Sequence, residues 1–227
     1  MSRRIAMLGV GLTVFALFIA SDVGVAAERR EAPAEEQDLG ARLWQELIES
    51  GARALSAGQL AEADRKFAEA LTHAEGRGAK DPMLAASLAM VAELRARQGR
   101  VDLAEQLYRR CIDACGESLG KDHVAVCTGL EGLARVLASK GKADESLKLL
   151  ARSLSIKEEA LDKEHPEVAA TIDTMVRVRI PSGRHDGLMD LCRRSLKIWE
   201  DQGKRSPMLA ASMQNMAVAM SIAERHD

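Results

Sequence analysis

One segment decides the fold: Asp122-His123-Val124-Ala125, which returns 42 residues later as Glu164-His165-Pro166-Glu167-Val168-Ala169. Looser copies stand at Asp81-Pro82-Met83-Leu84 and Ser206-Pro207-Met208-Leu209. Self-similarity at a fixed period of about 20–50 residues indicates a repeat architecture. The sequence therefore predicts a chain of similar units, each returning after about 42 residues.

Each unit has the pattern of a helical hairpin. Its midpoint is a glycine, and the glycines Gly58, Gly99, Gly141 and Gly183 follow one another at intervals of 41, 42 and 42 residues. Hydrophobic residues make up 47% of the chain but aromatics only 3%, so the apolar surface is mostly Ala, Leu, Val, Ile and Met. Because Ala and Leu are strong helix formers, the composition predicts an all-α protein.

The phase of the repeats sets the domain boundaries. We expect one superhelical domain over residues 38–226, and Asp38 is a candidate N-cap for its first helix. Pro181 is expected to end its helix early, because proline interrupts the helical hydrogen bonds. The predicted hairpins cover about residues 39–78, 81–119, 122–161 and 164–204, followed by a capping helix at 207–225.

The N-terminal segment has the order of a secretory signal. The positive residues Arg3 and Arg4 precede an apolar run from Ile5 to Ala20, and Ala27 is a small residue at a suitable cleavage point. This order predicts a signal peptide over residues 1–27 and export to a periplasm or beyond. The alternative is an uncleaved membrane anchor, although the run is short for a membrane span. Residues 28–37 are charged and predict a flexible leader.

The repeat resembles a known family. The pattern Leu130-x-x-Leu133-Ala134 … Gly141-x-x-Asp144-Glu145 … Leu150-x-x-Ser153-Leu154 is similar to the tetratricopeptide repeat. The period of 42 is similar to the long-helix variant of kinesin light chains and nephrocystin-like proteins. The resemblance implies a right-handed α-solenoid that binds proteins without catalysis and lines a concave groove with the first helix of each repeat. The family's late aromatic is replaced at Ala54, Arg95, Leu137, Arg179 and Ser221.

The resemblance also implies where a partner binds. On the third repeat's first helix, Thr128, Glu131 and Arg135 share the face that lines the groove in the family, and Asp173 and Arg177 recur one repeat later. We expect these residues, flanked by Glu93, Arg97 and Asn215, to bind an extended polar or acidic peptide, because guanidinium groups donate paired hydrogen bonds to carboxylates. The alternative is that each acid and the base four residues later only stabilise their helix.

Other function classes find little support in the sequence. The formal charge is −2 and no basic stripe stands out, so nucleic acid is not an expected partner. No phosphate loop, nucleophile elbow or metalloprotease motif is present, so we expect no enzyme activity and no cofactor. Cys111 and Cys115 lack a histidine that would complete a metal site. The alternatives to a peptide-binding module are a self-assembling scaffold and an accessory subunit of an enzyme complex.

Three smaller features leave alternatives open. Cys115 and Cys127 flank a short connection and form either a disulfide or two buried thiols. His123 and His165 recur in phase, which indicates a capping or turn role. The methionines of the last helix pack in the core or offer an adaptable surface for a partner or for self-association; they are Met208, Met213, Met216 and Met220.

Overall fold

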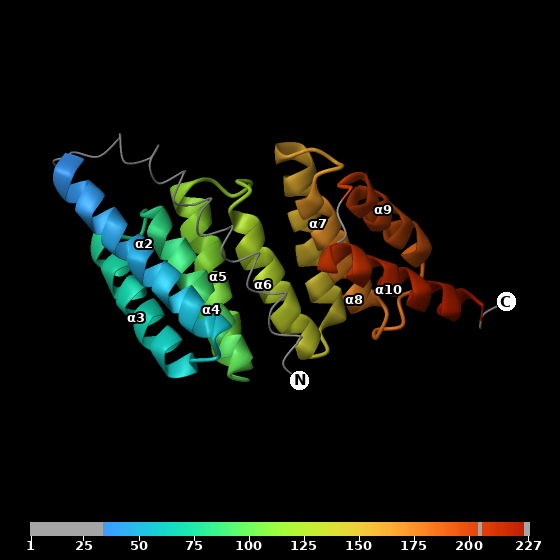
Figure 1. The fold of residues 1–227 in the computed structure, drawn as a ribbon, viewed down its shortest axis with the longest axis horizontal. Helices are drawn as coiled ribbons and strands as arrows, with labels where there is room; N and C mark the ends of the chain where they lie inside the picture. Colours follow the sequence, from blue (N-terminus) through green and yellow to red (C-terminus); the bar gives the residue numbers. More distant parts are fainter. Residues whose placement is uncertain (1–33, 204–205, 225–227) are drawn as a thin grey trace. The chain divides into compact units, whose positions relative to one another are not determined.

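The computed structural model describes residues 34–203 and 206–224, so the predicted signal peptide over residues 1–27 lies outside the described part. Within that part, helices are the regular elements and no strand occurs (Figure 1). The helices are α2 (Ala34–Ser56), α3 (Leu60–Arg77), α4 (Pro82–Arg97), α5 (Val101–Ser118), α6 (Val126–Ser139), α7 (Ala143–Ala160), α8 (Pro166–Arg179), α9 (Leu188–Asp201) and α10 (Pro207–Ala223). None of these helices is long and apolar enough to cross a membrane. The all-α fold class is confirmed.

The helices pack as two compact units that divide within α6, between Gly132 and Leu133. The first unit holds α2 to α5 and the start of α6, and the second holds the end of α6 and α7 to α10. The sequence predicted a single superhelical domain over residues 38–226. That domain boundary stays a prediction. Helix α6 carries the repeat residues across the division without interruption.

The recurring segment caps the first helix of a hairpin. Helix starts leave backbone N–H groups without helical acceptors, and a capping side chain supplies one. The predicted role of the two histidines is confirmed. The capping bonds run from Met83 N to Asp81 Oδ1 (2.9 Å), from Ala125 N to His123 Nδ1 (3.2 Å), from Glu167 N to His165 Nδ1 (3.2 Å) and from Leu209 N to Ser206 Oγ (3.0 Å).

Small residues let the helices approach closely. A Cβ on Gly51 of α2 would lie 2.4 Å from the Phe67 ring of α3, and one on Gly132 would lie 2.2 Å from the Tyr108 ring of α5. Both contacts are far shorter than van der Waals distance, so the aromatic rings occupy the space that the glycines leave open. The second helices bury the same three positions in every hairpin: Ala63, Phe67 and Ala70; Ala104, Tyr108 and Cys111; Ser146, Leu150 and Ser153; Leu188, Cys192 and Ser195.

Two helix ends deserve comparison with the prediction. Helix α2 begins at Ala34, so Asp38 lies inside the helix and is not its N-cap, and residues 34–37 of the predicted leader are helical. The reason is that the alanine, two glutamates and glutamine at those positions are good helix formers. Helix α8 ends at Arg179, two residues before Pro181, as predicted. The connection that follows, residues 180–187, is longer than the three-residue turn between α2 and α3.

Candidate functional site

In the first unit, the predicted groove residue Glu93 is a buried acceptor. Its side chain on α4 is almost enclosed, and it links two helices. Arg97 Nε donates to Glu93 Oε1 at 2.9 Å, and the Tyr108 hydroxyl of α5 donates to Glu93 Oε2 at 3.0 Å. A buried carboxylate is stable only when such donors compensate its lost hydration. Glu93 therefore fixes the α4–α5 contact and orients Arg97, while its predicted place beside a peptide-binding groove stays a prediction.

Arg97 has one donor without an acceptor. Its side chain is 18% exposed, and Nη2 is enclosed without a hydrogen-bond partner among the described residues. A buried donor that makes no hydrogen bond costs about 1–3 kcal/mol. Arg97 Nε already donates to Glu93. This bond holds the guanidinium in one orientation and thereby fixes the direction of the Nη2 donor. This geometry suits a further oxygen acceptor.

In the second unit, Asp173 of α8 is also buried, with 6% of its surface exposed. Ser195 Oγ of α9 donates to Oδ1 at 2.8 Å and Trp199 Nε1 of α9 donates to Oδ2 at 2.9 Å. Asn215 Nδ2 of α10 donates to Oδ1 at 3.3 Å. Ser195 Oγ is also 2.8 Å from Ser212 Oγ of α10. The carboxylate thus joins three helices, and Asp173 and Asn215, both predicted for the groove, serve this junction.

Arg177 lies one helical turn after Asp173 on α8. The Asp173 oxygens accept hydrogen bonds from α9 and α10. Arg177 is exposed, and its Nη2 donates to Thr174 Oγ1 at 2.9 Å. Thr174 Oγ1 in turn donates to the carbonyl of Ala170 at 3.0 Å. The guanidinium is therefore held near the α8 surface by a neutral side chain.

The remaining predicted residues lie on α6. Thr128 and Glu131 belong to the first unit and Arg135 to the second, and all three are partly exposed. Glu131 and Arg135 each take part in a polar interaction. All eight predicted residues are thus on first helices or on α10. The structure separates them into buried junction acids, Glu93 and Asp173, and residues with accessible surface.

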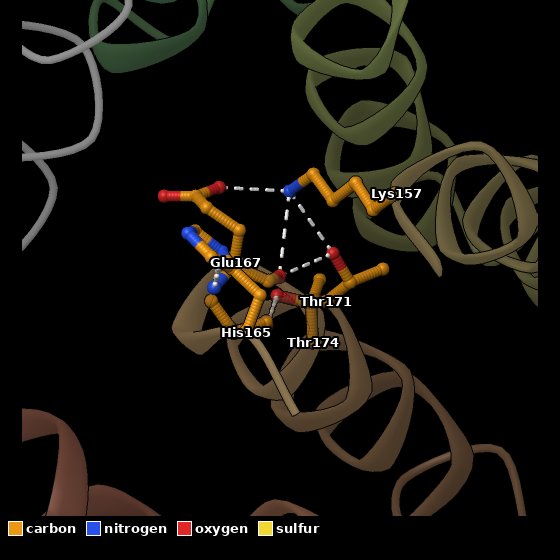
Figure 2. Close-up of polar contacts among 6 residues, drawn as sticks. Lys157, His165, Glu167, Thr171 and Thr174 are labelled. Atoms are coloured by element: carbon orange, nitrogen blue, oxygen red, sulfur yellow. Dashed lines mark hydrogen bonds and ion pairs between the residues drawn. The ribbon is translucent and has the colours of Figure 1, made fainter. Parts of the chain in front are cut away.

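Lys157 of α7 was not predicted, and among the described residues of the second unit it is the one buried lysine or arginine. Figure 2 shows its ammonium group between side chains and backbone of α8. Nζ donates to Glu167 Oε2 at 2.9 Å, to Thr171 Oγ1 at 3.1 Å and to the Glu167 carbonyl at 3.5 Å. The corresponding repeat positions hold the buried residues Ala74 and Cys115. The sequence signal that could have predicted the burial of Lys157 is therefore a lysine at a repeat position that is otherwise apolar.

All four cysteines are buried thiols, so no disulfide joins Cys115 to Cys127. Of the two alternatives left open, buried thiols are the one observed, in keeping with the frequent burial of cysteine as a small apolar residue. Burial raises the pKa of the Cys115 thiol to about 12, and the nearby Cys127 adds to the shift. Burial also raises the pKa of Cys111 and of Cys192. The described residues contain no cluster of three or more His, Cys, Asp or Glu side chains arranged for a metal.

Two surface depressions lie among the described residues. One, of about 370 Å³, lies between the end of α7 and α9, where Arg194 pairs with Glu158 at 2.6 Å and Lys197 with Glu164 at 3.5 Å. The other, of about 620 Å³, is a shallow groove between α2 and α3 that includes the half-exposed Leu43. The first is filled with charges that already pair with each other. Neither contains a residue predicted for the binding site.

Comparisons with known proteins agree with this geometry. The tetratricopeptide repeat family model matches residues 85–159. A comparison with curated proteins finds no match. Among solved structures, a putative kinesin light chain with nearly identical TPR-like repeats from Podosopora anserina is 22% identical, with a TM-score of 0.68, and the alignment covers 82% of this chain and 89% of the other. BtubC (BKLC) from P. vanneervenii is 19% identical with a TM-score of 0.73, covering 92% and 84%.

The structural likeness concerns the fold. Tetratricopeptide repeats are in general protein–protein interaction modules, and the fold is typically non-catalytic. The matched segment includes α5, α6 and most of α4 and α7, which share the cap, turn and core positions described above. The helical hairpins of this chain therefore have the fold of kinesin light chain-like tetratricopeptide repeats, and the family model matches residues 85–159.

Proposed function

We propose that this protein is a non-catalytic binding module that holds an extended, acidic or polar segment of a partner protein. The observation that carries the proposal is the Arg97 guanidinium, whose Nε is fixed by Glu93 while Nη2 is enclosed without an acceptor. A carboxylate oxygen of a partner would contact the guanidinium through the exposed part of the Arg97 side chain, which is 18% exposed. Charge-assisted hydrogen bonds of this kind are about twice as strong as neutral ones.

A second observation, from the other unit, supports the same ligand chemistry. Arg177 is exposed on α8, and Thr174, a neutral side chain, accepts one of its hydrogen bonds. Arg135 stands at the same repeat position 42 residues earlier, and Glu93 stands there in the second repeat. Arg135 and Arg177, both in the second unit, thus stand on successive first helices, and a partner segment with carboxylates at intervals matches them. Glu93 acts as a positioning residue for Arg97.

The proposal includes export. The order of charged, apolar and small residues over residues 1–27 supports removal of a signal peptide, and periplasmic or secreted localisation follows from it. An exported tetratricopeptide-repeat module would meet partners in that compartment. The binding chemistry of Arg97 and Arg177 is independent of this step, so each part of the proposal has its own test.

The binding test uses a fluorescein-labelled oligo-glutamate peptide as probe, with an oligo-lysine peptide as its counterpart. Fluorescence anisotropy at several salt concentrations gives the affinity and its salt dependence. Replacing Arg135 and Arg177 together by Glu, or Arg97 by Glu, should weaken binding of the acidic peptide by about 10-fold or more, since a charge-assisted hydrogen bond contributes about 1.5–3 kcal/mol. Circular dichroism checks that each variant keeps its helices.

The matched control is Arg193→Glu on α9. Arg193 is 64% exposed and pairs with Asp190, so the change in charge is the same but the residue lies on a second helix. The control should bind the acidic peptide as the unmodified chain does. The proposal fails if the unmodified chain does not prefer the acidic peptide, or if the Arg97 and Arg135/Arg177 variants keep its affinity and salt dependence.

A further inference from the structure

The last helix, α10, carries exposed apolar side chains beside the exposed polar residues Gln214 and Ser221. From Pro207 to Ala223 it contains no charged residue. One face covers its own unit: Ala219 is buried with Val176, Leu188 and Cys192, and Met216 and Ile222 pack against that cluster. The apolar stripe of a helix normally faces a core or a partner. The other face of α10 therefore calls for an explanation.

That other face is exposed. Met213 is 56% exposed and Met220 is 49% exposed. Ala210 and Ala217 are exposed on the same side, so the four residues form a stripe with spacings of three, four and three. We call it the Met–Ala stripe. The described residues include no helix that covers it.

The corresponding positions of the other first helices are buried. Counted from Pro82, Pro166 and Pro207, the position of Met213 holds Leu88 and Ile172, which are 1% and 0% exposed. In α8 this stripe is Ala169, Ile172 and Val176, and it packs against Ile198, Leu188 and Cys192 of the second helix α9. In α8, therefore, the face that corresponds to the Met–Ala stripe is the one that packs against its second helix, α9.

The stripe is complementary to a second copy of itself. If two α10 helices pair antiparallel about a two-fold axis between residues 213 and 217, Met213 lies opposite Ala217 of the second copy. Met220 then lies opposite Ala210, so each layer places one large side chain against one small one, as interdigitated helix packing requires. Spacings of three and four residues are those of a helix-pairing seam. The absence of charge on α10 removes like-charge repulsion between copies.

We propose that two copies of this protein associate through their α10 helices, antiparallel, with the Met–Ala stripe of each covering that of the other. A two-fold contact uses the same surface on both copies and closes on itself, so it gives a dimer and not a filament. The peptide-binding residues Arg97 and Arg177 lie on other helices. The dimer and the proposed peptide binding are therefore separate inferences.

The first test measures the mass of the full chain by light scattering after size exclusion, as a function of concentration. The unmodified chain should be dimeric, and Met213→Lys should be monomeric. The matched control is Val218→Lys, which places the same charge at another exposed apolar position of α10, 38% exposed and outside the stripe. This control should remain dimeric. All variants keep the same N-terminal segment, so any association through that segment is common to them.

The second test reads the direction of pairing. A chain with Met213→Cys is mixed with a chain with Ala217→Cys and oxidised with glutathione disulfide. Antiparallel pairing predicts cross-links between the two variants, because positions 213 and 217 face each other. Parallel pairing predicts cross-links within the Met213→Cys sample alone. The native cysteines are buried and serve as the common background.

Three results would overturn the proposal. These are a monomeric unmodified chain at high concentration, a dimer that survives Met213→Lys, and cross-links that form only between identical positions. A monomer whose Met–Ala stripe instead binds an added amphipathic helix would show that the stripe recognises another partner. The peptide-binding test is unaffected by any of these outcomes, since it is read from anisotropy with Arg97 and Arg177.

Discussion

Substituting Gly132 by alanine tests how tightly the helices are packed around Tyr108. Gly132 lies on α6, and a Cβ there would stand 2.2 Å from Tyr108 Cε1 and 2.4 Å from Cζ. The ring cannot stay where it is, because these distances are well below van der Waals contact. Tyr108 is buried, and its hydroxyl donates to Glu93 Oε2 at 3.0 Å. Moving the ring therefore also disturbs the bond that holds Glu93.

Two effects of Gly132→Ala oppose each other. Replacing a glycine inside a helix by alanine stabilises it by about 0.5–1 kcal/mol. Forcing a methyl group into a filled core costs about 1–3 kcal/mol, and losing a hydrogen bond to a carboxylate costs about 1.5–3 kcal/mol. The loss outweighs the gain, so we expect the free energy of unfolding to fall by about 1.5–5.5 kcal/mol.

The assay is urea unfolding followed by circular dichroism, with hydrogen exchange to locate the damage. Gly76→Ala is the matched control: Gly76 also lies in a helix of the first unit, and nothing lies within 4 Å of the Cβ it would gain. That variant should be more stable by about 0.5–1 kcal/mol. Tyr108→Leu combined with Gly132→Ala should lose less than the two single losses added together. The packing argument is refuted if Gly132→Ala matches Gly76→Ala in stability.

Three further predictions follow from the second unit, the cysteines and the N-terminus. Lys157→Met should change stability by less than about 1 kcal/mol, because an apolar side chain can replace a buried cation. Glu167→Gln removes the carboxylate that accepts from Lys157 Nζ and should cost about 1–3 kcal/mol in urea unfolding. Iodoacetamide should label Cys115 only after unfolding. Burial raises the pKa of the Cys115 thiol from 9.0 to about 12, so the folded state favours the protonated thiol. The free energy of unfolding should therefore fall as pH rises from 9 toward 12. Below pH 9 Cys115 should not make it depend on pH. Expressed in a Gram-negative host, the chain should lose its first 27 residues; an intact N-terminus in the membrane fraction, read by mass spectrometry, would favour the anchor instead.

The sequence alone predicts the helical hairpins because their signals are local. A capping side chain such as His165 bonds to a backbone N–H two residues later, so the partner is fixed by the segment itself. The glycine turns also recur in phase, as do the small–large–small positions of the second helices α3, α5 and α7, and neither needs a distant residue. The resemblance to tetratricopeptide repeats rests on these local features, and the family match over residues 85–159 agrees with it.

The candidate site was only partly predictable, because burial depends on how each helix is rotated against its neighbours. Glu93 and Asp173 look like groove residues when read along one helix. Their hydrogen-bond donors, Tyr108 for the first and Trp199 for the second, come from other helices, 15 and 26 residues away. The spacing of Asp173 and Arg177 along α8 does not reveal the donors from α9 and α10 that reach the carboxylate.

The sequence by itself thus determined the period, the caps and the all-α hairpins, since hydrogen bonds and packing within a few residues specify them. Only the tertiary structure decided which polar side chains are enclosed, that Lys157 is held against α8, and that α10 leaves the Met–Ala stripe uncovered. Helical periodicity places an apolar residue on a face but does not say which neighbour covers that face. For α10, α9 packs against the side that holds Ala219, while Met213 and Met220 are left exposed.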